Sequence, residues 1–238
     1  EQFIKRIFDP QNTLKQVTAI TQTTDKNYLI STATRGLQLV SSEGDNNTLR
    51  SLPITSNDRA FRNISSLVAV GSQYLAASEN GGLLIFSLKG NQVQLKKNLG
   101  ENQLFVSDIL VDQSGNALVS VNNDGVYRFD PTSETLQKIE FAPETKSFSN
   151  GPAKKATDVQ PSVMAKGTKG IWFGNTSGGV GQIQLNGNKG QIFCFDNKIL
   201  SSVVVSSLYE LDDQLWIGTL GKGLFSYNLK TDSLQHYG

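Results

Sequence analysis

The sequence is poor in the residues that most often carry chemistry. It contains one cysteine, Cys194, and one histidine, His236, in 238 residues. A single cysteine cannot form an internal disulfide or a cysteine-based metal cluster, and a single histidine excludes any site that needs two. Most kinds of zinc enzyme are therefore excluded, and we expect neither a bound metal nor a cofactor.

Charge is also scarce, and its two signs balance. Charged residues make up 18% of the chain, below the roughly 25% of ordinary soluble domains. The 22 lysines and arginines offset 21 aspartates and glutamates, which leaves a formal net charge of +1. Such a charge creates no field that would attract nucleic acid or an anionic membrane surface. We therefore expect no nucleic-acid partner.

Long hydrophobic runs are missing as well. A membrane-spanning helix needs about 18 or more consecutive apolar residues, and the longest candidate, Val203 to Leu211, is interrupted by serines and Glu210. Any membrane attachment would therefore come from segments outside this chain. The chain begins at Glu1 without the basic and apolar regions of a signal peptide, which fits either cytosolic residence or a signal already removed.

What the sequence does contain is an internal repeat. Five glycines align without gaps at spacings of 46, 43, 54 and 44 residues, namely Gly36, Gly82, Gly125, Gly179 and Gly223. A leucine or tryptophan stands seven residues before each glycine, and a leucine or valine follows it directly. A small residue stands five positions before it, as Ser31, Ala77, Ser120, Gly174 and Gly218. Repeats of roughly 40–50 residues are typical of solenoids, propellers and arrays.

The periodicity inside one repeat is that of β-strands. Leu215 to Thr219 and Leu224 to Tyr227 flank a short glycine turn, which predicts a hairpin. With one further strand upstream and one downstream, each unit becomes a four-stranded antiparallel meander. The five predicted units span residues 17–52, 63–95, 106–141, 159–195 and 205–238.

Strands such as Tyr28-Leu29-Ile30 are apolar on both faces, which requires neighbouring sheets on both sides. The small residue of each repeat is then explained by sheets that converge there and leave little volume. These features predict an all-β chain, a β-propeller built of four-stranded antiparallel blades, with no helix longer than two turns.

The last repeat resembles a known family. Its core, Leu215-Trp216-Ile217-Gly218-Thr219-Leu220-Gly221-Lys222-Gly223-Leu224, and its late strand, Leu234 to Tyr237, are similar to the two-component-regulator propeller repeat. Residues 171–180 form a weaker copy, and the first three units lack the tryptophan. Similar proteins use such propellers as periplasmic sensor regions of hybrid histidine kinases, mostly in Bacteroidetes, that respond to glycans. The resemblance implies a periplasmic or extracellular location, with the signal peptide already removed.

The resemblance and the scarcity of catalytic residues favour a non-enzymatic sensory module. Its partners would be an oligosaccharide and either the remainder of its own receptor chain or a homodimer partner. The first alternative is a propeller scaffold for protein assembly at the cell envelope, as in secretion-associated proteins. The second alternative is a propeller lyase or hydrolase, which should show acid and base residues clustered near the axis.

The two ends of the chain predict a larger propeller. Residues 1–10 contain one isolated closing strand, Phe3 to Phe8, whereas each of the five units has four strands of its own. We therefore expect further blades beyond Gly238, seven in all. Without them, the uncovered face of the last blade would expose apolar residues such as Val205, Leu215 and Phe225.

Two regions are candidates for ligand or partner contact. The turn between the second and third strands of each unit, here called the middle turn, emerges on one face of a propeller. The spacing of 54 residues also reveals an insertion, Phe141 to Ala156, that forms either a mobile loop or a contact site. The candidate residues are Arg35, Asn80, Asn123, Asp124 and Ser177 in the middle turns, with Lys154 and Lys155 in the insertion.

Other conspicuous residues have structural explanations. Trp172 and Trp216 occupy equivalent repeat positions, so we expect them between adjacent blades rather than as sugar-stacking platforms. Cys194 stands between two phenylalanines on a strand and is expected to be buried. His236 is expected to pack in an outer strand. The glycine-rich stretches 174–181 and 218–223 are expected to form hairpin turns, since neither has the order of a phosphate-binding loop.

Overall fold

The computed structural model describes residues 16–33, 35–40, 49–51, 58–78, 81–101, 103–148, 156, 159–195 and 198–238. The chain divides into two compact units, residues 1–106 and 107–238. Across the described ranges, strands dominate and one short 3-10 helix, η1 (Asp58–Phe61), interrupts them. The predicted strand Phe3 to Phe8 and the candidates Asn80, Lys154 and Lys155 lie outside the described residues.

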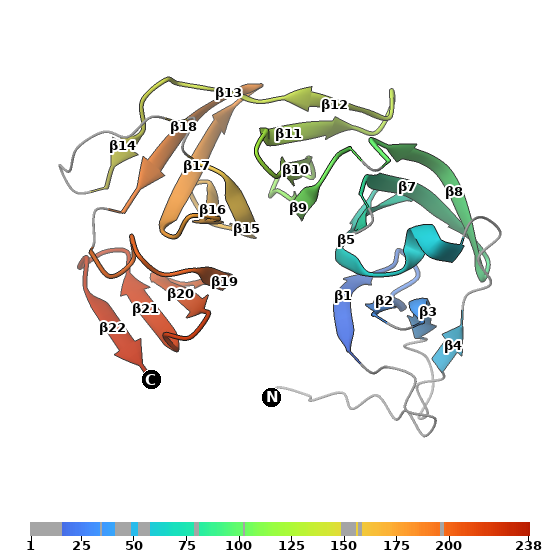
Figure 1. The fold of residues 1–238 in the computed structure, drawn as a ribbon, viewed down its shortest axis with the longest axis horizontal. Helices are drawn as coiled ribbons and strands as arrows, with labels where there is room; N and C mark the ends of the chain where they lie inside the picture. The colour runs from blue at the N-terminus through green and yellow to red at the C-terminus, as the bar shows by residue number, and fades with distance from the viewer. Residues whose placement is uncertain are drawn as a thin grey trace. The chain divides into compact units, whose positions relative to one another are not determined.

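The first unit contains two four-stranded antiparallel sheets (Figure 1). The first sheet is β1 (Val17–Gln22), β2 (Tyr28–Thr32), β3 (Gly36–Val40) and β4 (Leu49–Ser51). The second sheet is β5 (Ile64–Val70), β6 (Gln73–Ser78), β7 (Leu83–Lys89) and β8 (Gln92–Leu99). In each sheet, strands that are consecutive in the chain are also neighbours in space.

The second unit contains three sheets (Figure 1). The third sheet is β9 (Val106–Val111), whose first residue still belongs to the first unit, with β10 (Ala117–Val121), β11 (Gly125–Asp130) and β12 (Thr135–Lys138). The fourth is β15 (Pro161–Lys166), β16 (Ile171–Asn175), β17 (Val180–Asn186) and β18 (Lys189–Cys194). The fifth is β19 (Val205–Leu211), β20 (Gln214–Thr219), β21 (Leu224–Asn228) and β22 (Leu234–Tyr237). The five predicted meanders are thus confirmed.

The insertion differs from its prediction. Its described part contains two short strands, β13 (Glu140–Phe141) and β14 (Lys146–Ser147), which pair in parallel with β18 of the fourth sheet. The predicted third unit, residues 106–141, is therefore wrong at its end, because its fourth strand, β12, stops at Lys138. The physical reason is that β18 is an edge strand, whose unpaired backbone groups accept further strands.

The repeated glycine is confirmed as the hairpin turn of every sheet. All five aligned glycines have positive φ values, from 67° at Gly36 to 116° at Gly125. A side chain is unfavourable in this left-handed region, and glycine carries none. The turn geometry therefore explains why glycine stands at this position in all five repeats.

The sheets bury apolar side chains against one another. In the first unit, Leu29 and Leu37 of the first sheet share a buried cluster with Leu84 and Phe86 of the second. In the second unit, one cluster joins the third sheet to the fourth, and another joins the fourth sheet to the fifth. Hydrogen bonds cross these contacts too, since Ser120 Oγ donates to the carbonyl of Pro161 at 2.6 Å.

One expectation about the last sheet is wrong. Val205, Leu215 and Phe225 do not lie on an uncovered face, because all three are buried against the fourth sheet. Successive residues of a strand point to opposite faces, so the other face of β20 carries Trp216 instead. The physical reason is that the period of a strand separates its two faces but does not say which of them meets the preceding sheet.

At Gly174, the small residue of the repeat has the steric role that the sequence predicts. A Cβ atom added at Gly174 would lie 2.5 Å from Cβ of Val205 in the next sheet. At the equivalent Gly218, an added Cβ would lie 2.3 Å from the hydroxyl oxygen of Ser207 in the same sheet, an atom that can rotate away.

We expect Gly174→Ala to lower the free energy of unfolding by about 1–3 kcal/mol, because the fourth and fifth sheets would have to separate. Gly218→Ala is the matched control and should cost clearly less. Urea unfolding followed by circular dichroism measures both. Equal losses for the two variants would contradict the proposed close approach of the sheets at Gly174.

Candidate functional site

The middle turns hold the described candidate residues, and these lie in different units. Arg35 belongs to the turn between β2 and β3 in the first unit, where its backbone N–H donates to Thr32 Oγ1 at 3.2 Å. Its side chain is exposed. Asn123, Asp124 and Ser177 belong to middle turns of the second unit. A role for these residues in ligand contact stays a prediction.

Asp124 is engaged by its own sheet. Its carboxylate pairs with the ammonium of Lys138 and accepts a hydrogen bond of 2.6 Å from the hydroxyl of Tyr127. The hydrogen bond from Lys138 is the main cause that holds the pKa of Asp124 below its ordinary value, and the same contact raises the pKa of Lys138. The neighbouring Asn123 adopts a positive φ of 59°, which is typical of a turn residue.

Ser177 lines a small cavity of about 180 Å³ at the middle-turn end of the fourth sheet. Its hydroxyl oxygen accepts a hydrogen bond of 2.6 Å from the side-chain amide of Asn175. Cys194 and Phe195 line the same cavity, whereas Asn123 and Asp124 do not. Cys194 is only half-buried, so its expected full burial is wrong.

A larger cleft lies between the fourth and fifth sheets and extends from Phe195, at the middle-turn end of β18, to the turns at the opposite end of the strands. Its volume is about 470 Å³, within the range of about 300–1,000 Å³ typical of small-molecule pockets. Turns of both sheets and the insertion contribute to it. Its lining residues are Phe148, Thr168, Lys169, Trp172, Gln182, Phe195, Asp212, Asp213, Tyr227, Leu229, Lys230 and Asp232. We call this the 4–5 cleft.

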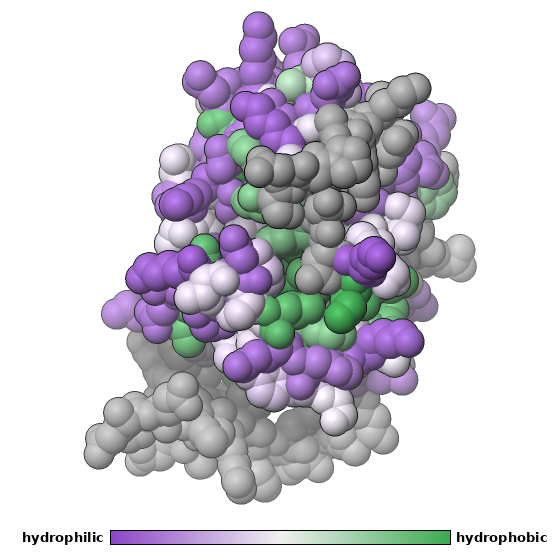
Figure 2. Space-filling model, turned by 90° about the vertical axis from the view of Figure 1, so that its left-hand side faces the viewer, coloured by the Kyte–Doolittle hydropathy of each residue, from purple (hydrophilic) through white to green (hydrophobic). Residues whose placement is uncertain are grey.

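Figure 2 looks onto the side of the second unit where β14, β18 and β22 lie. Hydrophobic side chains gather there between hydrophilic ones. A mixed surface of this kind is typical of small-molecule sites, in which apolar walls are combined with a few polar groups.

Aromatic rings form one wall of the 4–5 cleft. Phe148 of the insertion stacks on Phe195, with ring centroids 4.7 Å apart, and lies 5.7 Å from the ring of Trp172. Phe195 also contacts Tyr227 of the fifth sheet edge to face, at 4.6 Å. Phe148 is 38% exposed, so its ring forms the outer part of the wall.

A carboxylate of the fifth sheet holds this wall in place. Glu210 accepts hydrogen bonds from the indole N–H of Trp172 and from both the backbone N–H and the hydroxyl of Thr168, the last two at 3.0 and 2.5 Å. Because an unpaired indole N–H is unfavourable when buried, this contact fixes the ring of Trp172. The position of Trp172 between adjacent sheets, with 2% exposure, is confirmed.

Polar groups surround the aromatic wall. Gln182 is 3% exposed, and its side-chain oxygen accepts a hydrogen bond of 3.1 Å from Gln184. Among the described residues, its amide nitrogen makes no hydrogen bond. At the rim, Lys230 pairs with Asp213 at 2.6 Å, and the hydroxyl of Tyr227 donates to Asp232 at 2.9 Å.

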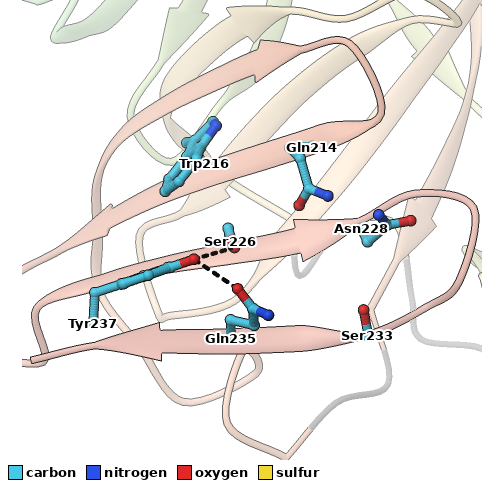
Figure 3. A pocket seen from close by; sticks show the side chains of 7 residues that line it. All are labelled: Gln214, Trp216, Ser226, Asn228, Ser233, Gln235 and Tyr237. Carbon is cyan, nitrogen blue, oxygen red and sulfur yellow. Dashed lines mark hydrogen bonds between the residues drawn. The ribbon is translucent and has the colours of Figure 1, made fainter.

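The outward face of the fifth sheet carries a third cavity, of about 260 Å³ (Figure 3). Trp216 lies there beside Tyr237, with ring centroids 5.7 Å apart, and Tyr237 donates to Gln235 at 2.6 Å. Trp216 is therefore only partly buried. Its expected place between adjacent sheets is wrong for this structure, because it lines an open cavity on the face that points away from the fourth sheet.

His236 has the packing role that the sequence predicts. Its ring stacks on Phe225 at a centroid distance of 4.4 Å, and its Nε2 atom hydrogen-bonds the carbonyl of Lys222 at 2.7 Å. Across the part of the chain that the structure describes, no three His, Cys, Asp or Glu side chains are grouped closely enough to hold a metal ion. No helix within that part is long and apolar enough to cross a membrane.

The 4–5 cleft could not be predicted from the sequence. The candidate residues lie in the middle turns, whereas the cleft runs along the seam between two sheets and reaches the opposite turns, such as Asp212-Asp213. The one sequence feature that pointed toward the cleft was the insertion, which contains Phe148 and has no counterpart in the other repeats. Its contact with Phe195 could not be inferred, because residues outside a repeat have no counterpart that fixes their position.

Comparison with known proteins identifies the architecture. No family model matches the sequence, and no curated protein sequence matches it. The structure is similar to the extracellular domain described as the one-component system BT4673 from B. thetaiotaomicron, with a TM-score of 0.64 and 17% identity over 93% of this chain. It is also similar to the extracellular domain of the hybrid two-component system BT3049 from the same organism, with a TM-score of 0.61 and 18% identity over 92%. This chain spans 29% of the length of either protein.

A third similar structure is an enzyme. It is virginiamycin B lyase from Staphylococcus aureus, with a TM-score of 0.64 and 14% identity over 97% of this chain and 72% of the lyase. The β-propeller domain of Cps50 from Myceliophteria thermophila is similar too, with a TM-score of 0.62 and 7% identity, over 92% of this chain and 72% of that one. The fold is that of a β-propeller. Each of the five sheets is one blade, as the repeat predicts.

Burial makes the hydroxyl of Tyr227 sensitive to alkaline pH. Burial, reinforced by the hydrogen bond to Asp232, raises the pKa of Tyr227 from 10.0 to about 12. The native state therefore favours the neutral hydroxyl. Its contribution to stability is complete below pH 10 and is lost as the pH rises through 12.

We expect the difference in unfolding free energy between the wild type and Tyr227→Phe to fall over this pH range by on the order of 1–3 kcal/mol. Urea unfolding at several pH values measures it. A difference that stays constant with pH would show that the tyrosine hydroxyl is not buried as described.

The two tryptophans should differ in their contribution to stability. Trp172→Ala removes a buried ring and leaves Glu210 without its indole donor, so we expect a loss of about 3–5 kcal/mol. Trp216→Ala should cost clearly less, because Trp216 is partly exposed. Equilibrium unfolding measures both, with Trp172→Phe as the milder variant if Trp172→Ala does not fold. A larger loss for Trp216→Ala would contradict the assignment of the faces.

Proposed function

We propose that this chain is part of the extracytoplasmic recognition domain of a receptor of the two-component type, and that it binds an oligosaccharide. The observation that carries the proposal is the similarity of its fold, over more than nine-tenths of its length, to the extracellular domains of two Bacteroides signalling systems. The resemblance of residues 215–224 to the two-component-regulator repeat supports it independently.

A binding role is favoured over catalysis by the state of the titratable groups. Similar folds include a lyase, so the fold alone does not separate the two. His236 is stacked on Phe225 and hydrogen-bonded to a carbonyl. The carboxylates of Glu210, Asp213 and Asp232 are each engaged by a neighbouring donor. Each of these groups therefore makes a structural contact, whereas general acid–base catalysis needs a group within hydrogen-bond reach of the substrate.

The outward face of the fifth sheet supports the proposal of a larger propeller. Trp216 occupies the repeat position of Trp172, which the next sheet covers through Glu210. We infer that a further blade of the same receptor or a homodimer partner covers Trp216 in a similar way. Transmission of the signal, through a histidine kinase or otherwise, would belong to segments other than residues 1–238.

Titration calorimetry of the purified chain against neutral disaccharides and trisaccharides tests this function. We expect at least one saccharide to bind and to remain chemically unchanged when the mixture is analysed by chromatography. Cleavage of the saccharide would instead support the lyase or hydrolase alternative. Failure of every saccharide to bind, with capture of a cell-envelope protein in a pull-down, would support the scaffold alternative.

A further inference from the structure

The 4–5 cleft has an apolar wall that can accept a flat ring. The exposed ring of Phe148 continues the stack formed by Phe195 and Trp172. Burying the apolar face of a ligand ring against these aromatic rings is favourable, because both surfaces leave water.

A buried amide adds a hydrogen-bond donor to this wall. Gln182 is nearly fully buried and lines the cleft, and its oxygen is already occupied by Gln184. Its amide nitrogen carries two N–H donors and makes no hydrogen bond among the described residues. This nitrogen is not among the fully buried side-chain atoms that lack a partner, so it is open to the cleft, where an acceptor on a ligand can receive its N–H groups.

The charges at the rim select a neutral ligand with groups that both donate and accept. Lys169 and Lys230 stand among Asp212, Asp213 and Asp232. An anion would face three carboxylates, and a cation would face two ammonium groups. A hydroxyl group can donate to a carboxylate and accept from an ammonium or an amide, so a ligand rich in hydroxyls satisfies every part of this lining.

We propose that the 4–5 cleft binds a short neutral saccharide, one ring of which stacks on Phe148 while its hydroxyls contact Gln182 and the Asp213–Lys230 pair. This inference rests on the proposed recognition function and assigns it to the seam between the fourth and fifth sheets rather than to the middle turns. Phe148, which comes from the insertion, would make the site specific to this chain rather than common to the repeat.

The chain provides its own reporter for the test. It contains two tryptophans, so Trp216→Phe leaves Trp172 in the cleft wall as the single source of tryptophan fluorescence.

The experiment titrates the Trp216→Phe protein with maltose, cellobiose, lactose and xylobiose and their trisaccharide counterparts. We expect a saturable change in Trp172 emission. Phe148→Ala should weaken binding by about tenfold, and Gln182→Ala by about three- to tenfold. Phe105→Ala is the matched control, since Phe105 is also exposed, at 56%, and does not line the cleft; it should leave affinity unchanged.

Three results would overturn the proposal, and they separate it from the proposed function. If calorimetry detects a saccharide but Trp172 emission does not change, recognition stands and this site is wrong. If Phe148→Ala and Phe105→Ala bind as tightly as the parent protein, the aromatic wall is not the contact. If no saccharide binds by either method, the proposed ligand class and this site both fail.

Discussion

The structure depends on the burial of sheet faces against neighbouring sheets. A four-stranded sheet with apolar residues on both faces is not stable alone in water, and its two faces must be covered. In the second unit, the fourth sheet meets this requirement on both sides. Phe173 and Ile183 pack toward the third sheet, and Trp172 and Val180 pack toward the fifth. The small residue at Gly174 is a direct consequence, because a larger residue would push Val205 away.

The same requirement decides where a site can form. In the middle of the strands, the side chains must be apolar because neighbouring sheets bury them. Polar and ionisable groups therefore lie mainly in the turns at the two ends of the strands. At one end, Asp124 and Ser177 are engaged within their own turns and sheets. Along the seam between the fourth and fifth sheets, the insertion adds Phe148, and Glu210 connects the two sheets. The 4–5 cleft therefore combines a rigid aromatic wall with polar turns, which suits recognition better than proton transfer.

Features fixed by local geometry could be predicted from the sequence. The hairpin turn of each repeat requires a positive φ, which Gly36 and its four equivalents adopt. Packing between neighbouring sheets requires a small residue at Gly174 and buries Trp172. The exposure of Trp216 could not be predicted in this way, because burial of a sheet face depends on what lies beside it. β13 and β14 were also missed, since a strand that joins the edge of the following sheet leaves no period in the sequence.

The candidate site was the least predictable part. Gln182 looked like any polar strand residue, and its value as a donor follows only from its burial and from its bond with Gln184. Phe148 lay in a segment whose composition indicated a loop. Sequence reasoning named the candidates of the middle turns because the repeat places them on one face, and nothing in the repeat marks the other end as different.

The most direct test of this account is a crystal structure of the chain with a saccharide that binds it. The account expects the sugar in the 4–5 cleft, with a ring against Phe148 and a hydroxyl accepting a hydrogen bond from the side-chain amide of Gln182. A sugar bound at the middle turns near Ser177, or against Trp216 on the outward face of the fifth sheet, would contradict it.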